Sequence, residues 1–95
     1  MLDNRAAVRL QILIILASAQ AYTLNQEVLL NQLRSTGFAL NRDQLKIELA
    51  WLDQVAQCVI DNAVGGVHIA TLTAEGSEVL DGTRHVPGID KPGPR

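Results

Sequence analysis

Apolar residues in the first part of the chain recur at the spacing of an amphipathic helix. Residues 4–21 contain no Gly or Pro, and with Asp3 or Asn4 as the cap they predict a long first helix. Its apolar positions fall into two stripes: Val8, Ile12, Ile15, Leu16 and Ala19 form the first, and Leu10, Leu13, Ile14, Ala17 and Ala21 form the second. A helix that is apolar on two sides either runs through the centre of the fold or meets a partner chain.

Two further helices are predicted, each beginning at an asparagine. After an extended link at residues 22–24, Asn25 caps the second helix and Gly37 ends it in a left-handed conformation. Asn41 and Gln44 match an Asn variant of the capping box, so the third helix begins there and runs to about residue 56. Its core stripe is Leu45, Leu49, Leu52 and Ala56, with Val55 alongside.

The apolar period changes after the third helix. Residues 58–60 and 67–72 have β-type patterns, and the Gly65-Gly66 pair between them predicts the turn of a β-hairpin. Thr73 then caps a short last helix, residues 74–81, which Gly82 ends. Three prolines follow from residue 83 on, which excludes a helix there. We therefore expect one domain over residues 1–82 and a flexible Pro/Gly-rich tail over residues 83–95 that is dispensable for folding.

Composition, charge and cysteine count limit the kind of protein that this chain can be. Of 95 residues, 47% are hydrophobic and 3% aromatic, which predicts one small globular domain with an aliphatic core. Eight basic and ten acidic residues give a net charge of −2, which excludes a polybasic tail. The single cysteine, Cys58, excludes an intrachain disulfide and fits a reducing compartment. The apolar run at residues 10–17 is too short to span a bilayer, so we expect a cytoplasmic protein without membrane contact.

The order of the predicted elements is that of a winged helix-turn-helix domain, an α+β fold. Trp51-Leu52, Cys58-Val59-Ile60 and Ile69-Ala70-Thr71-Leu72-Thr73-Ala74-Glu75-Gly76 resemble the third-helix, wing and "LTxxG" segments of ArsR- and MarR-type regulators. Residues 85–94 are similar to the ends of small stand-alone winged-helix proteins encoded by Mu-like prophages and tailed phages. The resemblance implies a three-helix core, a two-stranded hairpin wing and a short C-terminal helix. The third helix contains no Cys or His, so metal sensing is not carried over.

Residues suited to catalysis are sparse. His68 and His85 are the only histidines, and no phosphate-binding loop, nucleophile elbow or metal-ligand spacing is present. Cys58 and His68 together would be too few ligands for a zinc ion. We therefore predict no catalytic residues, metal, cofactor or small-molecule substrate, and a protein that is not an enzyme.

DNA binding is the leading functional hypothesis. The third helix of a helix-turn-helix domain enters the major groove, and Arg42, Gln44 and Lys46 at its start can contact bases or phosphates. Arg34, at the end of the second helix, can reach the backbone of the same double-stranded DNA. Asp43 on the same helix repels phosphate, however, and the predicted wing, residues 62–68, carries no Lys or Arg to bind it. Alternatively, these charges only solvate an exposed helix.

Two apolar stripes of the sequence are candidate contacts with partner proteins. The stripe of Leu10, Leu13, Ile14 and Ala17 has little else to cover it, so we predict a homodimer interface there and a regulator that acts as a dimer. Ile47 and Trp51 form a second stripe on the third helix, where Trp51 either anchors the hairpin or belongs to a protein-binding patch. The latter would suit the alternative function: a phage protein-interaction module in assembly or DNA packaging, without DNA binding.

Overall fold

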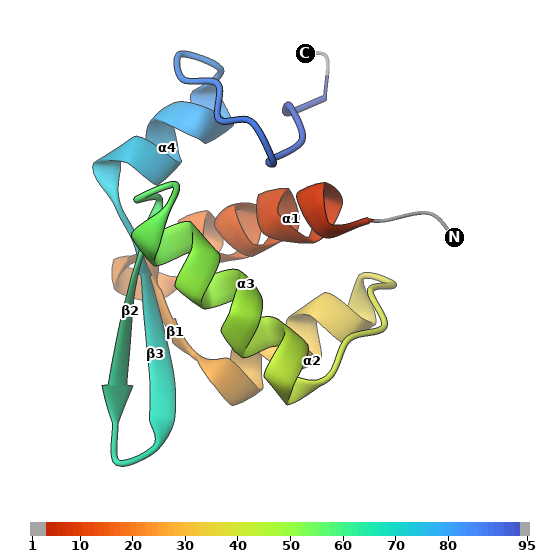
Figure 1. The fold of residues 1–95 in the computed structure, drawn as a ribbon, viewed down its shortest axis with the longest axis vertical. Helices are drawn as coiled ribbons and strands as arrows, with labels where there is room; N and C mark the ends of the chain where they lie inside the picture. The colour runs from red at the N-terminus through yellow and green to blue at the C-terminus, as the bar shows by residue number, and fades with distance from the viewer. Residues whose placement is uncertain (1–3, 94–95) are drawn as a thin grey trace.

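The computed structural model describes residues 4–93, so Asp3, one of the two predicted caps, and the outermost residues of the predicted domain and tail lie outside it. This part of the chain contains four α-helices and a three-stranded antiparallel sheet, which confirms the α+β class. The elements are α1 (Arg5–Ser18), a 3-10 turn (Gln20–Tyr22), β1 (Thr23–Asn25), α2 (Gln26–Ser35), α3 (Arg42–Gln54), β2 (Val59–Val64), β3 (Val67–Leu72) and α4 (Ala74–Asp81). Figure 1 shows the helices gathered at one side of the sheet, with the β2–β3 hairpin extending beyond them. The arrangement is compatible with a winged helix-turn-helix.

The later helix ends follow the capping residues in the sequence, whereas Asn4, a predicted cap of α1, makes no side-chain cap hydrogen bond. The side chain of Asn25 accepts a hydrogen bond from the first turn of α2, and Asn41 with Gln44 forms both bonds of a capping box on α3. Thr73 caps α4, and Gly82 ends that helix at a φ of 88°. These four predicted boundaries are confirmed, because each depends on hydrogen bonds between neighbouring residues.

The sheet has one strand more than the predicted hairpin. β2 and β3 pair around the Gly65-Gly66 turn as expected, with Val59 opposite Leu72 and Val64 opposite Val67. β1, which we expected to be only an extended link, pairs with the other side of β3 and gives the order β1-β3-β2. The sheet thus joins a segment that precedes α2 to a hairpin that follows α3.

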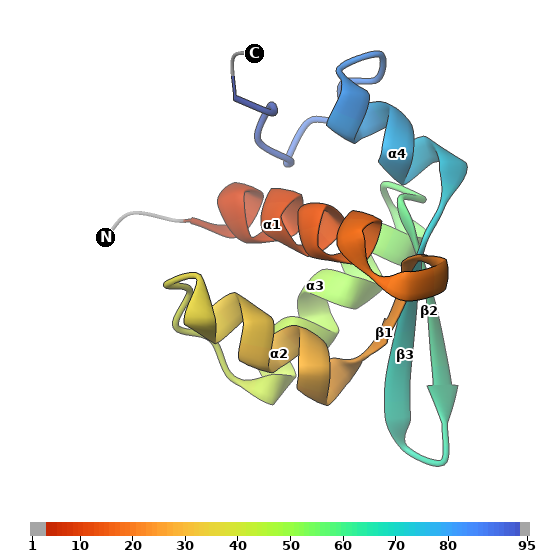
Figure 2. The ribbon, with the colours of Figure 1, turned by 180° about the vertical axis from the view of Figure 1, so that it is seen from behind.

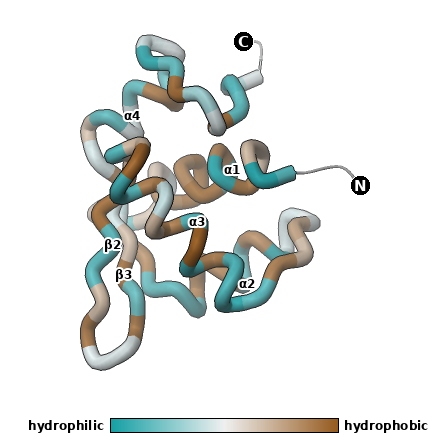
Figure 3. Tube along the Cα trace, viewed as in Figure 1, coloured by the Kyte–Doolittle hydropathy of each residue, from teal (hydrophilic) through white to brown (hydrophobic). Residues whose placement is uncertain are grey.

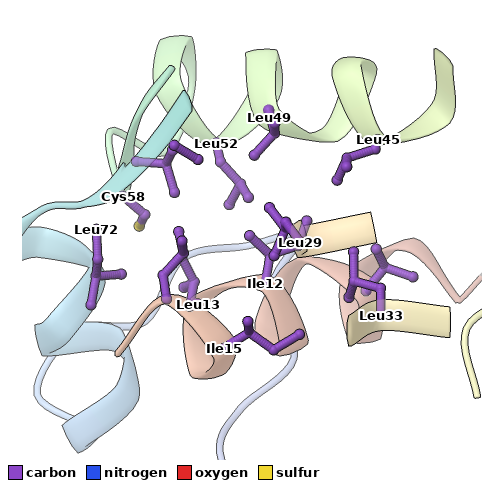
Figure 4. Packing of buried hydrophobic residues seen from close by; sticks show 14 of the residues in the cluster. Ile12, Leu13, Ile15, Leu29, Leu33, Leu45, Leu49, Leu52, Cys58 and Leu72 are labelled. Atoms are coloured by element: carbon purple, nitrogen blue, oxygen red, sulfur yellow. The ribbon is translucent and has the colours of Figure 1, made fainter. Parts of the chain in front are cut away.

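Helix α1 lies at the centre of the fold and contacts α2, α3, α4 and β3. Figure 4 shows Leu13 pointing from α1 into the same apolar layer as Ile12 and Leu52, and Leu13 is completely buried. The predicted dimer face is therefore wrong at Leu13, because α4 packs against α1 within the same chain. Leu10 and Ala17 are partly buried, and only Ile14 of that stripe is exposed.

Hydropathy along the chain agrees with this burial. Figure 3 shows hydrophobic positions recurring along α1, α2 and α3, which supply most of the buried leucines. Among the described residues, no helix combines the length and the apolar character that crossing a bilayer requires.

A buried glycine lets α4 pack closely against the start of the hairpin. Gly76 lies in the first turn of α4, and a Cβ atom there would collide with the carbonyl oxygen of Cys58. The backbone N–H of Thr73 also donates a hydrogen bond to that oxygen (3.0 Å). The glycine of the Leu-Thr-x-x-Gly segment is thus required by packing.

The segment after α4 packs against the helices instead of forming a flexible tail. Ile89 is only 4% exposed and belongs to the main core cluster. Its backbone N–H closes a turn onto the carbonyl of Val86 (3.1 Å), and the N–H of Asp90 donates to the carbonyl of Ala6 in α1 (3.2 Å). Figure 2 shows this segment passing between α4 and the first half of α1. The expectation of an unpacked tail is therefore wrong at Ile89, although the segment has no helix or strand.

Replacing the buried isoleucine tests this packing. Ile89→Ala should lower the free energy of unfolding by about 2–4 kcal/mol, because it removes buried methyl groups and leaves a cavity. The exposed neighbour His85, replaced by Ala, is the control and should change stability by less than about 0.5 kcal/mol. Chemical denaturation measures both. Equal stability of the two variants would show that the segment is not packed in solution.

Candidate interaction surface

The four predicted DNA-contacting residues lie at the junction of α2 and α3, but three are engaged within the chain. Arg34 donates from Nε to the carbonyl of Leu40 (3.2 Å). The side-chain oxygen of Gln44 accepts from the backbone N–H of Asn41 (2.8 Å) as part of the capping box. Among the described residues, Lys46 takes part in none of the ion pairs.

Arg42 forms a two-bond ion pair with Glu27. Its Nε donates to Glu27 Oε2 (2.6 Å) and its Nη2 to Oε1 (2.8 Å), so the first turns of α2 and α3 are bridged. The Arg42 guanidinium, with a smaller contribution from the Gln26 amide, lowers the pKa of Glu27 from 4.5 to about 2, and the carboxylate in turn raises the pKa of Arg42. At neutral pH the positive charge of Arg42 is therefore balanced locally by Glu27.

Two acidic side chains accompany Lys46, the one other basic residue of α3. Asp43 is exposed in the first turn of α3, next to Arg42. Asp53, near the other end, accepts a hydrogen bond from the backbone N–H of Asp61 in β2 (2.9 Å). Phosphate contacts depend on uncompensated Lys and Arg side chains, and this surface supplies few of them.

A shallow apolar groove lies beside these charges. Ile47 of α3 is 56% exposed, whereas the core residues of the same helix are buried. The groove has a volume of about 310 Å³ and is lined by Asn4, Arg5, Val8, Phe38, Ala39, Leu40, Gln44, Ile47 and Glu48. We call it the Ile47 groove. It is bounded by the start of α1, the α2–α3 turn and α3, so it can accept an apolar side chain from outside the molecule.

Trp51 does not line this groove. The guanidinium of Arg9 lies 3.8 Å from the centroid of the Trp51 ring. Gly88 covers the other part of the ring so closely that a Cβ atom there would lie 2.9 Å from Cζ2. Trp51 is therefore held by α1 and the C-terminal segment, and the patch that combines it with Ile47 is not formed.

A buried ion pair, which the sequence analysis missed, fixes this region. Arg9 and Glu48 are 8% and 5% exposed, and Arg9 Nε donates to Glu48 Oε1 (2.6 Å). Arg5 donates to the other carboxylate oxygen (2.8 Å), and Arg9 Nη1 donates to the carbonyl of Gly88 (3.0 Å). The sequence does contain a signal for this buried carboxylate. Glu48 follows Leu45 by three residues and therefore lies on the same face of the helix as the core stripe of α3.

Polar contacts join the two strands of the β2–β3 hairpin and fix β3 to α2. Nδ1 of His68 lies 2.9 Å from Asp61 Oδ1, and the backbone N–H of His68 donates to the side-chain oxygen of Gln26 (2.8 Å). Cys58 lies at the opposite end of the hairpin from His68, and burial raises the pKa of its thiol. Within the described part of the chain, no cluster of three or more His, Cys, Asp or Glu side chains could bind a metal ion.

The Arg42–Glu27 pair gives a pH-dependent prediction. In the wild type the Glu27 carboxyl should titrate near pH 2, and Arg42→Ala should return its pKa toward 4.5. A depressed folded-state pKa stabilises the fold above the unfolded pKa, so this contribution is present above about pH 5 and is lost as the pH falls toward 2. NMR titration of the side-chain carboxyl measures both values. The same Glu27 pKa in both proteins would contradict the pairing.

The comparisons with known proteins connect the chain to a bacteriophage. "Uncharacterized protein gp26" of Escherichia phage Mu is 30% identical over 71 residues, which cover 75% of this chain and 73% of the phage protein. No protein-family model matches the chain, and no solved structure does. The expected likeness to proteins of Mu-like phages is therefore confirmed, while the likeness to ArsR- and MarR-type regulators stays a prediction. The chain belongs to the family of gp26 of phage Mu.

Proposed function

We propose that this protein is a winged-helix module that binds another protein through the Ile47 groove. The observation that carries the proposal is the 56% exposure of Ile47 in an apolar groove, beside cations that are mostly engaged within the chain. Burying one isoleucine at an interface stabilises a complex by about 1.5–3 kcal/mol before the costs of association. The winged helix-turn-helix fold is part of the proposal, supported by the order of elements and by the hairpin that follows α3.

The partner should present an apolar side chain with polar groups around it. Val8, Phe38 and Leu40 provide the apolar walls of the groove, and the Arg5–Glu48 ion pair lies at its edge. An apolar centre with a polar rim is the usual anatomy of a protein interface. Because the relative gp26 is a phage protein, we place the partner among phage proteins that act in assembly or DNA packaging.

DNA binding by a dimeric transcriptional regulator is the second candidate. Lys46 supports it, because this side chain forms no ion pair within residues 4–93 and follows the start of α3 by one turn. Arg34 adds an exposed cation to the half-buried Lys46. A few phosphate contacts per protomer would give weak binding with a shallow dependence on salt concentration.

One pair of variants tests the groove. Ile47→Glu should weaken binding to the partner at least about tenfold, because it puts a charge into an apolar contact. Val28→Glu, which alters an exposed valine on α2 outside the groove, should bind as the wild type does. Calorimetric titration against purified proteins encoded by the genes beside this one measures the affinities, and circular dichroism checks the folding.

The same preparations decide between the two candidates. A mobility shift of the flanking genomic DNA that persists in Ile47→Glu and disappears in the Arg42→Ala, Lys46→Ala double variant would establish the DNA-binding candidate. If, in addition, none of the neighbouring proteins distinguished Ile47→Glu from the wild type, the groove proposal would be wrong.

A further inference from the structure

The three-stranded sheet has one face that no helix covers. Strand residues alternate between the two faces, and the register of the pairs assigns each position to one of them. The buried residues Val59, Ala70 and Leu72 mark the inner face. The other face, which we call the outer face, consists of Thr23, Asn25, Ile60, Asn62, Val64, Val67, Ile69 and Thr71.

The outer face is uncharged and half apolar: Ile60, Val64, Val67 and Ile69 lie among two threonines and two asparagines. None of its eight positions holds a charged residue, and Ile60 and Val64 are 56% and 55% exposed. Its hydroxyls are paired with one another, since the Oγ1 atoms of Thr23 and Thr71 lie 3.0 Å apart. Figures 1 and 2 show the helices on the opposite side of the sheet, so this face is open in the single chain.

Charge favours a second copy of this chain as the occupant. Two identical copies of a protein with a net charge of −2 repel one another, and an isologous contact places each surface opposite itself. A surface without charge avoids like-charge contacts across such an interface. The titratable residues of the strands, Asp61 and His68, are bonded to each other and belong to the inner face. The α1 face that we first expected to dimerise is largely closed by α4.

We infer that two copies pack their outer faces together with the two hairpins antiparallel. This arrangement places Val64 at the hairpin tip of one copy opposite Ile60 at the base of the other. Ile69, which shares the central row with Asn62 and Asn25, then lies close to the two-fold axis. The contact does not involve the Ile47 groove, so it is independent of the proposed function.

The size of the face makes this a reversible dimer. Six-residue strands extend about 20 Å and three paired strands about 14 Å, so the footprint is below the roughly 800 Å² per partner of a stable interface. The dimer should therefore dissociate at micromolar concentration and form toward millimolar concentration.

Charge substitutions test the inferred pairing of Val64 with Ile60. Val64→Lys or Ile60→Glu alone should raise the dimer dissociation constant about a hundredfold, because each puts two uncompensated charges into the apolar contact. An equimolar mixture of the two variants should restore association, because in the mixed dimer the introduced charges are opposite in sign and face each other. Val28→Lys on α2 is the control and should dimerise as the wild type does. Analytical ultracentrifugation over this concentration range measures each constant.

Three results would overturn the inference. The first is a wild-type protein that stays monomeric at millimolar concentration. The second is dissociation caused by Ile14→Lys on α1 but not by Val64→Lys. The third is a mixture of Val64→Lys and Ile60→Glu that associates no better than either variant alone, with both variants folded by circular dichroism.

Discussion

The buried contact between Arg9 and Glu48 determines how the rest of this small protein is arranged. Removing two charges from water costs several kcal/mol each, and this cost is offset only where geometry and hydrogen bonds are good. Here the carboxylate accepts from both Arg5 and Arg9, and the Arg9 guanidinium also reaches the Trp51 ring and the Gly88 carbonyl. One charged cluster thus connects α1, α3 and the C-terminal segment, which are far apart in the sequence.

This cluster also determines which apolar surfaces stay open. Arg9 and Gly88 cover part of Trp51, the aromatic residue of α3, and Ile89 next to Gly88 is buried in the core. α4 packs on α1 and closes most of its second stripe. Two of the remaining open apolar surfaces, the Ile47 groove and the outer face of the sheet, lie in different parts of the molecule. The protein therefore has room for one partner in the groove and a second copy on the sheet.

The sequence predicted those helix ends and turns that depend on interactions between residues close together in the chain. Three helices begin at a capping residue that directly precedes an apolar periodic segment, namely Asn25, Asn41 and Thr73. The Gly65-Gly66 pair forms the hairpin turn that its two glycines predict. Ala21 and Tyr22 are different, since both have a φ of 57°, which neither residue type signals. That turn is needed only because β1 must reach β3, and strand pairing over such a distance leaves no local pattern.

The site was harder to predict for the same reason. Arg42 was correctly placed at the start of α3, but its pairing with Glu27 depends on the angle between two helices. Likewise, the tail was expected to be flexible from its prolines, although Ile89 needed only one turn at Pro87-Gly88 to enter the core. Candidate DNA contacts inferred from residue type alone therefore overstated the positive charge that this surface offers.

A double-mutant cycle on Arg9 and Glu48 tests the central claim most directly, with the free energy of unfolding as the measured quantity. Glu48→Met should lower it by about 3–5 kcal/mol, because it leaves the buried Arg9 guanidinium without a carboxylate. Arg9→Met should lower it by less, because Arg5 still donates to Glu48. The double variant should lose clearly less than the sum, since no unpaired charge remains. Additive losses, or single losses below about 1 kcal/mol, would contradict the claim that this ion pair organises the fold.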